Sequence, residues 1–373
     1  MTVEAGTPPE ARGTGPARTP RSGESPGRVT DGSRRRSARP TVVLAAGCVL
    51  LPLSVLAAVS IGSADLPPYD VLRVVAGHLG AGPADTVSPL RDSIVWDLRL
   101  PRVLLAALVG AGLTVCGTVL QALTRNPLAD PYLLGVSSGA STGAVAVLVL
   151  GAGSGSLALP TGAFAGALTA FGCVLVLLGR SLGGTTKVVL AGVMVSQLFS
   201  ALTSLTVLWA GDAEQTRSVT FWLMGSLAPA TWTSVTVCAG AAAAVLLLCL
   251  ARADTLDAFT FGREAASALG VEVRRTERLL YTGTAVLAGA LVSAGGAIGF
   301  VGLLVPHAAR FLVGARHRVL LPVGALLGAA FLVWADTAAR TLFSPQEMPV
   351  GVLTALLGVP AFAVLLRRRV AAP

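Results

Sequence analysis

The sequence predicts an all-α, polytopic membrane protein with about ten transmembrane helices. Of its 373 residues, 53% are hydrophobic and only 13% are charged, which is roughly half the charge of an ordinary soluble domain. The apolar residues gather in successive segments about as long as the ~20-residue helix that crosses a bilayer. Basic residues fall mainly between these segments on one predicted side, a bias typical of membrane topology.

The first 40 residues differ from the rest of the chain. They are rich in Pro, Gly, Ser and Thr, carry eight arginines and have almost no large apolar side chains. Such a composition cannot bury a core, and it lacks the apolar region and cleavage site of a signal peptide. We therefore predict a disordered cytoplasmic tail over residues 1–40 and a ten-helix transmembrane domain over residues 41–370.

The membrane domain begins with Thr41–Ile61, which has no charge and is long enough to cross a bilayer. Nine more apolar segments follow, and 303–313 is too short to cross without help from 298–302. Pro101 predicts that the second helix starts near that residue, because proline suits the first helical turn. The nine later segments are Val103–Ala122, Tyr132–Gly151, Leu159–Leu178, Val188–Trp209, Val235–Leu250, Leu279–Ala297, Leu303–Val313, Val319–Leu342 and Gly351–Leu366.

The charged connectors predict the orientation of these segments. With ten crossings and a cytoplasmic N-terminus, the C-terminal Arg367–Arg369 is cytoplasmic as well. The predicted external loop 62–98 holds five aspartates against two arginines. The predicted cytoplasmic connectors hold Arg125, Arg180, Lys187, Arg252, Arg263, Arg274, Arg275, Arg278, Arg316 and Arg318. This distribution follows the positive-inside rule, so it accounts for the net charge of +9 without a nucleic-acid partner.

Several classes of site are not indicated by the sequence. The stretch Gly179–Lys187 resembles a phosphate-binding loop, but no Lys directly follows its second Gly, and it joins two membrane helices. No serine, cysteine or carboxylate constellation suggests hydrolysis. His307 has no second histidine or carboxylate at a metal-ligand spacing. We expect no catalytic residue, no metal site and no cofactor in this chain, so energy for transport would come from a partner or an ion gradient.

Charged residues near the predicted external surface are the first candidates for function. Arg99 and Arg102 oppose the positive-inside rule, so they are either anchors that reach to lipid headgroups or a docking point for an acidic partner. Asp336 and Arg340 lie four residues apart and can pair on one helix face. This pair either locks helix packing or marks a functional site, as ionisable groups within membrane segments often do.

Residues 261–271 form the main candidate on the cytoplasmic side. They predict a short amphipathic helix that ends at Gly270, a residue suited to a helix C-cap. Five basic and five acidic residues balance between Arg252 and Arg278, which favours protein docking over lipid binding. Elsewhere, the prolines of 125–131 and the glycines of 295–302 predict interrupted helices, which need protein or a water-filled cavity around their backbone.

Taken together, these segments resemble the FecCD permease family of bacterial ABC importers for iron–siderophores, haem and vitamin B12. The resemblance covers about residues 94–367, in family order. Its strings are LRLPRVLLAALVGAGL, LTRNPLADPYLLGVSSGA, VVLAGVMVSQLFSALTSL, FWLMGSL, GREAASALGV, GAIGFVGLLVPHAARFLVG, HRVLLP, ADTAARTLF and MPVGVLTALLGVPAF. It implies a type II ABC importer permease fold in the bacterial cytoplasmic membrane, with both termini cytoplasmic.

The resemblance also implies partners and site residues. The partners are two ABC ATPase subunits, which carry the ATP and Mg, a second permease copy or paralogue, an extracytoplasmic substrate-binding protein or lipoprotein, and membrane lipid. Binding-protein docking is implied for Arg99, Arg102 and Arg340, and a cytoplasmic gate for Thr185 and Thr186. Contact with the ATPase is implied for Phe261–Val271, namely at Arg263, Glu264, Ala265, Ala266 and Gly270.

Two departures and several alternatives stay open. Arg316 precedes His317-Arg318 where relatives often have an acidic or small polar residue, and the long N-terminal tail is atypical. A ferric siderophore is the expected cargo, with cobalamin or haem as the alternative. Competing classes are an ion-coupled secondary transporter, for which Asp336 is the candidate carboxylate, and a non-transporting scaffold. Neither the choice of chelate nor homodimer against heterodimer follows from the residues.

Overall fold

The structure is a computed structural model that describes residues 32–62, 66–81, 87–151, 158–179, 184–209, 213–343 and 346–370. Within these ranges all regular structure is helical and no strand occurs, which confirms the all-α class. By its internal contacts the chain divides into Met1–Ala38 and a main body, Arg39–Pro373. Residues 1–31 of the predicted disordered tail lie outside the described residues. The first helix begins at Gly32, ahead of the predicted start at Thr41.

Ten apolar helices coincide with the ten apolar segments of the sequence. Among the described residues, seven contain spans long and apolar enough to cross a bilayer: α1 (Gly32–Ser60), α4 (Leu100–Thr124), α6 (Ala158–Leu178), α7 (Thr185–Leu208), α9 (Trp232–Ala251), α12 (Val273–Gly295) and α14 (His317–Thr341). Three apolar helices contain shorter spans: α5 (Val136–Leu150), α13 (Val301–Val313) and α15 (Val350–Val370). The polytopic class is therefore confirmed, whereas the count of ten crossings stays a prediction.

Short helices connect these spans. They are α2 (Pro68–His78), α3 (Pro89–Ser93), the π-helical turn η2 (Ile94–Arg99), the 3₁₀ turn η3 (Pro131–Leu134), α8 (Ala213–Leu223), α10 (Ala253–Thr260) and α11 (Arg263–Ala268). The α-helix α4 begins at Leu100 with Pro101 in its first turn, as predicted, but η2 and α3 continue the helical backbone upstream to Pro89. Pro101 has no N–H to donate. The Leu100 N–H instead reaches back five residues to the Val95 oxygen, so a widened π turn accommodates the proline.

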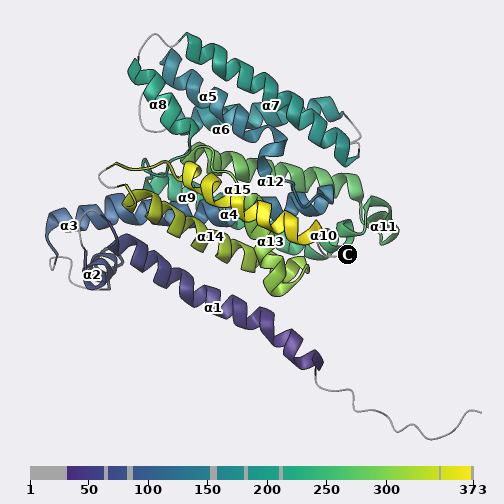
Figure 1. Cartoon of the computed structure of the whole chain (residues 1–373), viewed down its shortest axis with the longest axis horizontal. Helices are drawn as coiled ribbons and strands as arrows, with labels where there is room; N and C mark the ends of the chain where they lie inside the picture. Colours follow the sequence, from purple (N-terminus) through teal and green to yellow (C-terminus); the bar gives the residue numbers. More distant parts are fainter. Residues whose placement is uncertain are drawn as a thin grey trace, which may run out of the picture. The chain divides into compact units, whose positions relative to one another are not determined.

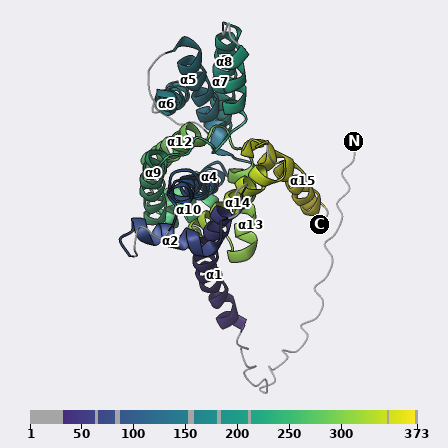
Figure 2. The ribbon, with the colours of Figure 1, turned by 90° about the vertical axis from the view of Figure 1, so that its left-hand side faces the viewer.

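Helix α4 lies at the centre of the main body. Nearly all of its side chains are buried, and α9, α12, α13 and α14 pack around it (Figure 2). A Cβ atom at Gly110 would collide with the Gly328 oxygen of α14, and one at Gly117 would collide with the Gly302 oxygen of α13. These helices therefore meet backbone to backbone, the close packing that small residues permit in membranes.

Helices α5, α6 and α7 pack together as a second group that contacts α12 (Figure 1). Two glycine pairs with the same spacing face each other across α5 and α6. A Cβ atom at Gly139 would meet the Gly166 oxygen, and one at Gly143 would meet the Gly162 oxygen. On each helix the two glycines are separated by three residues, so both lie on the face that contacts the other helix.

The predicted interruptions are present in the backbone. Residues 296–300 are not helical, and they separate α12 from α13. The Tyr132 hydroxyl, from η3, donates to the Ile298 oxygen at 2.8 Å and accepts from the Ile298 N–H at 2.8 Å. Phe300 has a φ of 68°, a left-handed conformation unusual for a bulky residue. Protein groups thus satisfy part of this irregular backbone, as a membrane requires.

The main body has two ends that carry different short elements. One end carries α2, α3 and the start of α4, while the other carries α10 and α11 (left and right in Figure 1). Helix α4 runs from the first end to the second, and α14 runs back. We name them the Asp336 end and the α11 end, after the groups described below.

Candidate functional site

Asp336, near the end of α14, is the centre of a group of ion pairs. Its side chain is 1% exposed, and its carboxylate oxygens accept hydrogen bonds from Arg102 Nε and Nη2 over 3.1–3.2 Å. One turn further along α14, Arg340 Nε lies 3.2 Å from Asp336 Oδ2. Arg102 Nη1 donates to Glu347 Oε2 at 2.8 Å. These four residues form what we call the Asp336 cluster.

Two arginines at this end also bind the last carbonyls of α1. Arg340 Nη2 donates to the Ala58 oxygen at 3.0 Å. Arg99 Nη1 donates to the Val59 oxygen at 2.9 Å and to the Ser60 oxygen at 3.2 Å. The final carbonyls of a helix have no partner within it, and positive charge there is favourable to the helix dipole. Arg99 and Arg340 thus fasten the end of α1 to α4 and α14.

Packing explains why Arg102 meets Asp336. The glycine contact between α4 and α14 brings the start of one helix beside the end of the other. A carboxylate buried in apolar surroundings is strongly unfavourable unless it is paired and hydrogen-bonded. Asp336 therefore takes both of the arginines within its reach, and the pair that the sequence predicts, Asp336 with Arg340, is present within a larger network.

The structure places all three arginines expected to dock a partner against internal groups. Arg99 and Arg102 are 8% and 9% exposed, and each has the partners given above. Sequence reasoning missed the contact between Arg102 and Asp336 and the role of Glu347. Local spacing could not have found either, because the residues that meet lie on separate helices. The docking role itself stays a prediction.

The α11 end is built from two short helices, each held to a long helix by a polar side-chain contact. In α11, Arg263 Nη2 lies 2.8 Å from Glu277 Oε2 of α12, whose side chain is 4% exposed. The helix ends at Ala268, with Leu269 as its C-cap. Gly270 follows with a φ of 84°, and the Gly270 and Val271 N–H groups donate to the Ser267 and Ala266 oxygens. This pattern is a Schellman motif, so the expected cap at Gly270 is present.

A second polar contact joins α10 to the start of α14. Asp257 Oδ1 lies 2.6 Å from His317 Nδ1 and accepts the His317 backbone N–H at 3.0 Å. The His317 side chain is buried, whereas Asp257 is one-third exposed. Because α14 also carries Asp336 near its opposite end, one continuous helix connects the α10–α11 region with the Asp336 cluster.

The surface of α11 combines apolar and charged side chains. Phe261 and Leu269, which flank the helix, are 78% and 71% exposed. Glu264 is exposed, Ala265 is partly exposed and Ala266 is fully buried. The residues expected to contact an ATPase therefore divide into a buried anchor and an outward surface. An exposed apolar pair on a charged connector is typical of a protein-docking surface.

Thr185 and Thr186, the expected gate residues, are the first two residues of α7. The next turn of α7 supplies Val188 to a small enclosed space that Thr124, Asp130 and Tyr281 also line, so these threonines lie at the α11 end. Burial raises the pKa of the Asp130 carboxyl to about 6, although the hydrogen bond from the Tyr132 N–H lowers it. No ion pair joins Asp130 to any other residue that the structure describes.

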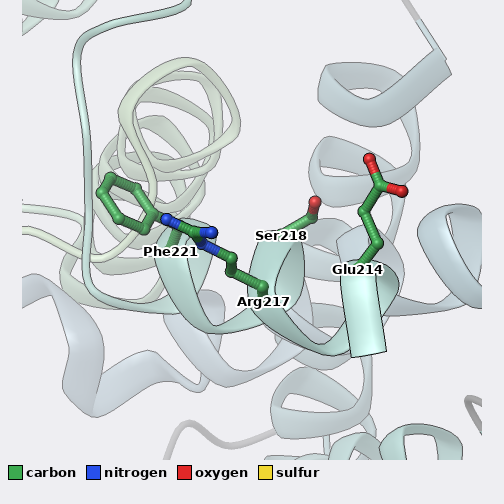
Figure 3. A pocket seen from close by; sticks show the side chains of 4 residues that line it. All are labelled: Glu214, Arg217, Ser218 and Phe221. Atoms are coloured by element: carbon green, nitrogen blue, oxygen red, sulfur yellow. The ribbon is translucent and has the colours of Figure 1, made fainter. Parts of the chain in front are cut away.

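A cavity of about 550 Å³ opens over α8, and sequence reasoning did not predict it. Four exposed residues from this single helix line it: Glu214, Arg217, Ser218 and Phe221. Figure 3 shows Arg217 extending to the same side as Phe221, with Glu214 at the other end of the row. Its volume is in the range of ligand pockets, but its lining comes from one surface helix. Among the described residues, no cluster of His, Cys, Asp and Glu has the arrangement of a metal site.

Comparison with known proteins identifies the family. The sequence profile of the FecCD transport family matches residues 50–368. The chain belongs to this family. The match includes both ends described above, from the last turns of α1 to the last turn of α15.

The names of similar permeases state which compounds those relatives import. The cobalamin import system permease protein BtuC of Halobacterium salinarum is 44% identical, over 84% of this chain and 82% of its own length. The hemin transport system permease protein HmuU of Yersinia pestis is 42% identical, over 74% and 84%. The iron(3+)-hydroxamate import system permease protein FhuB of Bacillus subtilis is 36% identical, over 88% and 83%.

A solved structure shares the fold. A metal-chelate type ABC transporter in an inward-facing conformation superposes with a TM-score of 0.77 at 32% identity, covering 88% of this chain and 99% of the other. Family, relatives and fold agree, so the chain is a multi-span permease subunit of an ABC importer. The related permeases import iron(3+)-hydroxamate, hemin or cobalamin. Membership of the family therefore does not identify the compound that this chain transports.

Proposed function

We propose that this permease moves a ferric siderophore across the cytoplasmic membrane, driven by two separate ATPase subunits and supplied by an extracytoplasmic binding protein. The observation that carries the proposal is the presence, at opposite ends of one helical body, of an exposed apolar surface on α11 and an arginine-rich cluster around Asp336. A second copy or a paralogue completes the pathway, with both termini on the cytoplasmic side.

The α11 end is the proposed ATPase contact. Phe261 and Leu269 supply apolar area, while Arg263 and Glu277 fix α11 to α12. A displacement of α11 is therefore transmitted to the membrane helix α12 through this ion pair, and not through the connecting loop alone. The Asp257–His317 pair carries the same displacement to α14. Packed elements of this kind pass displacements on because they have discrete arrangements.

The Asp336 end is the proposed docking face. Arg99, Arg102 and Arg340 supply positive charge, which steers an acidic partner toward its correct orientation. ATP-driven closure of the ATPase subunits then shifts α11 and the bundle, and Thr185 and Thr186 at the start of α7 open or close the cytoplasmic gate. Access to the pathway alternates between the two faces. The chain itself hydrolyses nothing in this scheme.

Two findings support a ferric siderophore as the cargo. The iron(3+)-hydroxamate permease is similar over 88% of this chain, and the metal-chelate transporter superposes over the same share. The cobalamin and hemin permeases are more identical over shorter stretches, so cobalamin or haem is the alternative cargo. For an ion-coupled carrier the candidate carboxylate is Asp336, and two arginines already neutralise it.

Uptake by proteoliposomes tests the proposal. The permease is reconstituted with an ATPase and a binding protein from the same genome, and uptake of ⁵⁵Fe-desferrioxamine is measured beside labelled hemin and cyanocobalamin. We expect ATP-dependent accumulation of the iron chelate. Accumulation of only hemin or cobalamin would overturn the cargo. Accumulation driven by an ion gradient without the ATPase would overturn the transport class.

Retention of the ATPase tests the α11 contact separately. The variant Phe261→Ser/Leu269→Ser is expected to insert normally but to lose most of its co-purifying ATPase, as is deletion of Glu264–Gly270. Leu79→Ser is the matched control, because Leu79 is 72% exposed at the Asp336 end. Equal retention by the double variant and the control would remove α11 from the contact.

A further inference from the structure

Glu347 differs from Asp336 in how it holds Arg102. The Asp336 side chain is 1% exposed and binds Arg102 through Nε and Nη2, whereas the Glu347 side chain is 48% exposed and binds only Nη1, at 2.8 Å. One carboxylate is therefore part of the buried interior. The other reaches the guanidinium from the surface, where solvent or a partner also reaches it.

The positive charge that the Asp336 cluster presents depends on the contact between Glu347 and Arg102. Arg102 and Arg340 are balanced by Asp336 and Glu347, and Arg99 adds one positive charge. An acidic partner thus approaches a group whose positive charge is almost cancelled. When Glu347 leaves Arg102, Nη1 offers its hydrogen bond again, and the local surplus of positive charge increases. Charge-assisted hydrogen bonds to a guanidinium are among the stronger polar contacts, so this change matters for docking.

The residues on both sides of Glu347 are held by backbone hydrogen bonds, so a rotation of its side chain is enough to release Arg102. On one side, the Gln346 N–H donates to the Phe343 oxygen at 2.9 Å. On the other, the Met348 N–H donates to the Ala339 oxygen of α14 at 3.1 Å. Rotation of an exposed side chain takes place in picoseconds to nanoseconds, far faster than protein association.

We propose that Glu347 is an internal counter-ion that occupies the place of the partner's carboxylate on Arg102. The partner's acidic group exchanges with Glu347, so this residue sets how acidic a partner must be to dock. The inference rests on the proposed docking role of the arginines. An exchange of one ion pair for another changes binding modestly, because exposed pairs contribute little. Glu347→Gln is therefore expected to raise partner affinity about two- to fivefold at low salt.

Chemical labelling of Arg102 tests the inference without any partner. The arginine-selective reagent p-hydroxyphenylglyoxal is applied to the detergent-purified permease, and modification of Arg102 is followed by peptide mass spectrometry. We expect faster modification in Glu347→Gln than in the wild type. Glu347→Asp keeps the charge on a shorter side chain and is also expected to label faster. Asp92→Asn is the control, since Asp92 is 34% exposed at the same end and pairs with His78.

The labelling outcomes decide the inference in either direction. Equal rates in Glu347→Gln, Asp92→Asn and the wild type would overturn it, because Glu347 would then not cover Arg102. Faster labelling in both glutamate variants, with no change in the control, supports it. Melting temperatures within about a degree of the wild type exclude misfolding as the cause.

Partner binding separates this inference from the proposed function. The affinity of the binding protein is measured at 50 and 300 mM salt for the wild type, Glu347→Gln and Asp92→Asn. No binding to the wild type would overturn the docking proposal itself. Binding that Glu347→Gln strengthens more than Asp92→Asn does supports the exchange. Equal affinities, or weaker binding by Glu347→Gln, would overturn the exchange and leave the docking face intact.

Discussion

The charged residues at the two ends of the main body are arranged differently. At the Asp336 end, one buried carboxylate binds two arginines, and three helices meet there through those arginines. At the α11 end, the Arg263–Glu277 and His317–Asp257 contacts each join one basic side chain to one carboxylate, and one member of each is about one-third exposed. The first arrangement holds long helices together. The second attaches short helices to long ones at contacts that water reaches.

This difference has a physical consequence for what each end can do. Removal of one member of a buried ion pair leaves an uncompensated charge in apolar surroundings, so the Asp336 cluster resists rearrangement. At the α11 end, Arg263 and Asp257 are each about one-third exposed and regain water when their contacts open, which lowers the cost of opening. The α11 end is thus the more adaptable of the two, as an element that receives a mechanical signal requires. Within the Asp336 cluster, the half-exposed Glu347 is the adaptable member.

The largest expected effect comes from Asp336→Asn. The substitution leaves Arg102 and Arg340 without their shared buried charge, so we expect a loss of about 3–5 kcal/mol in the free energy of unfolding. The apparent melting temperature in detergent, read by fluorescence-detected size exclusion, measures it. Asp92→Asn, at the same end but one-third exposed, is expected to change stability by under about 0.5 kcal/mol. Similar melting temperatures for the two variants would contradict the comparison.

Glu277→Gln is expected to have a smaller effect on stability. Arg263 is about one-third exposed and can turn to water when its partner is neutralised, so the loss is about 1–3 kcal/mol. Its effect on coupling is expected to be clearer, because α11 then lacks its ion pair with α12. ATPase stimulation by loaded binding protein in proteoliposomes measures this, and we expect it to fall severalfold. Unchanged stimulation would mean that the displacement of α11 is transmitted by another route.

The same comparison shows what the sequence could predict. Apolar segments of bilayer length identify the helices, because hydrophobic length depends only on neighbouring residues. The pairing of Asp336 with Arg340 and the cap at Gly270 are equally local, since both follow from helix geometry. The Asp336–Arg102 contact is not local, because it depends on the glycine contact that sets α4 against α14. The π turn at Ile94–Arg99 was missed for a similar reason, since a proline is compatible with either a helix start or a local bulge.

The smallest expected effect concerns Asp130, a carboxyl at the α11 end that contrasts with Asp336 because no described cation pairs with it. Burial raises the pKa of Asp130 to about 6, above the ordinary value of about 3.9. Between these values the unfolded chain has released this proton while the folded chain still holds it. Stability therefore falls as pH rises from about 4 to about 6, and the loss is complete above that range.

Asp130→Asn is expected to remove this pH dependence. The asparagine oxygen can still accept the Tyr132 N–H, so the local turn is kept. Because the side chain is only partly buried in the structure, solvent screening limits the effect to about 1 kcal/mol or less. Melting temperatures at pH 4.5 and 7.5 measure it: the two proteins should agree at the lower pH, and the wild type should be less stable at the higher. Parallel pH profiles for both proteins would show that Asp130 is as well compensated as Asp336, and the contrast between the two ends would then concern geometry rather than charge.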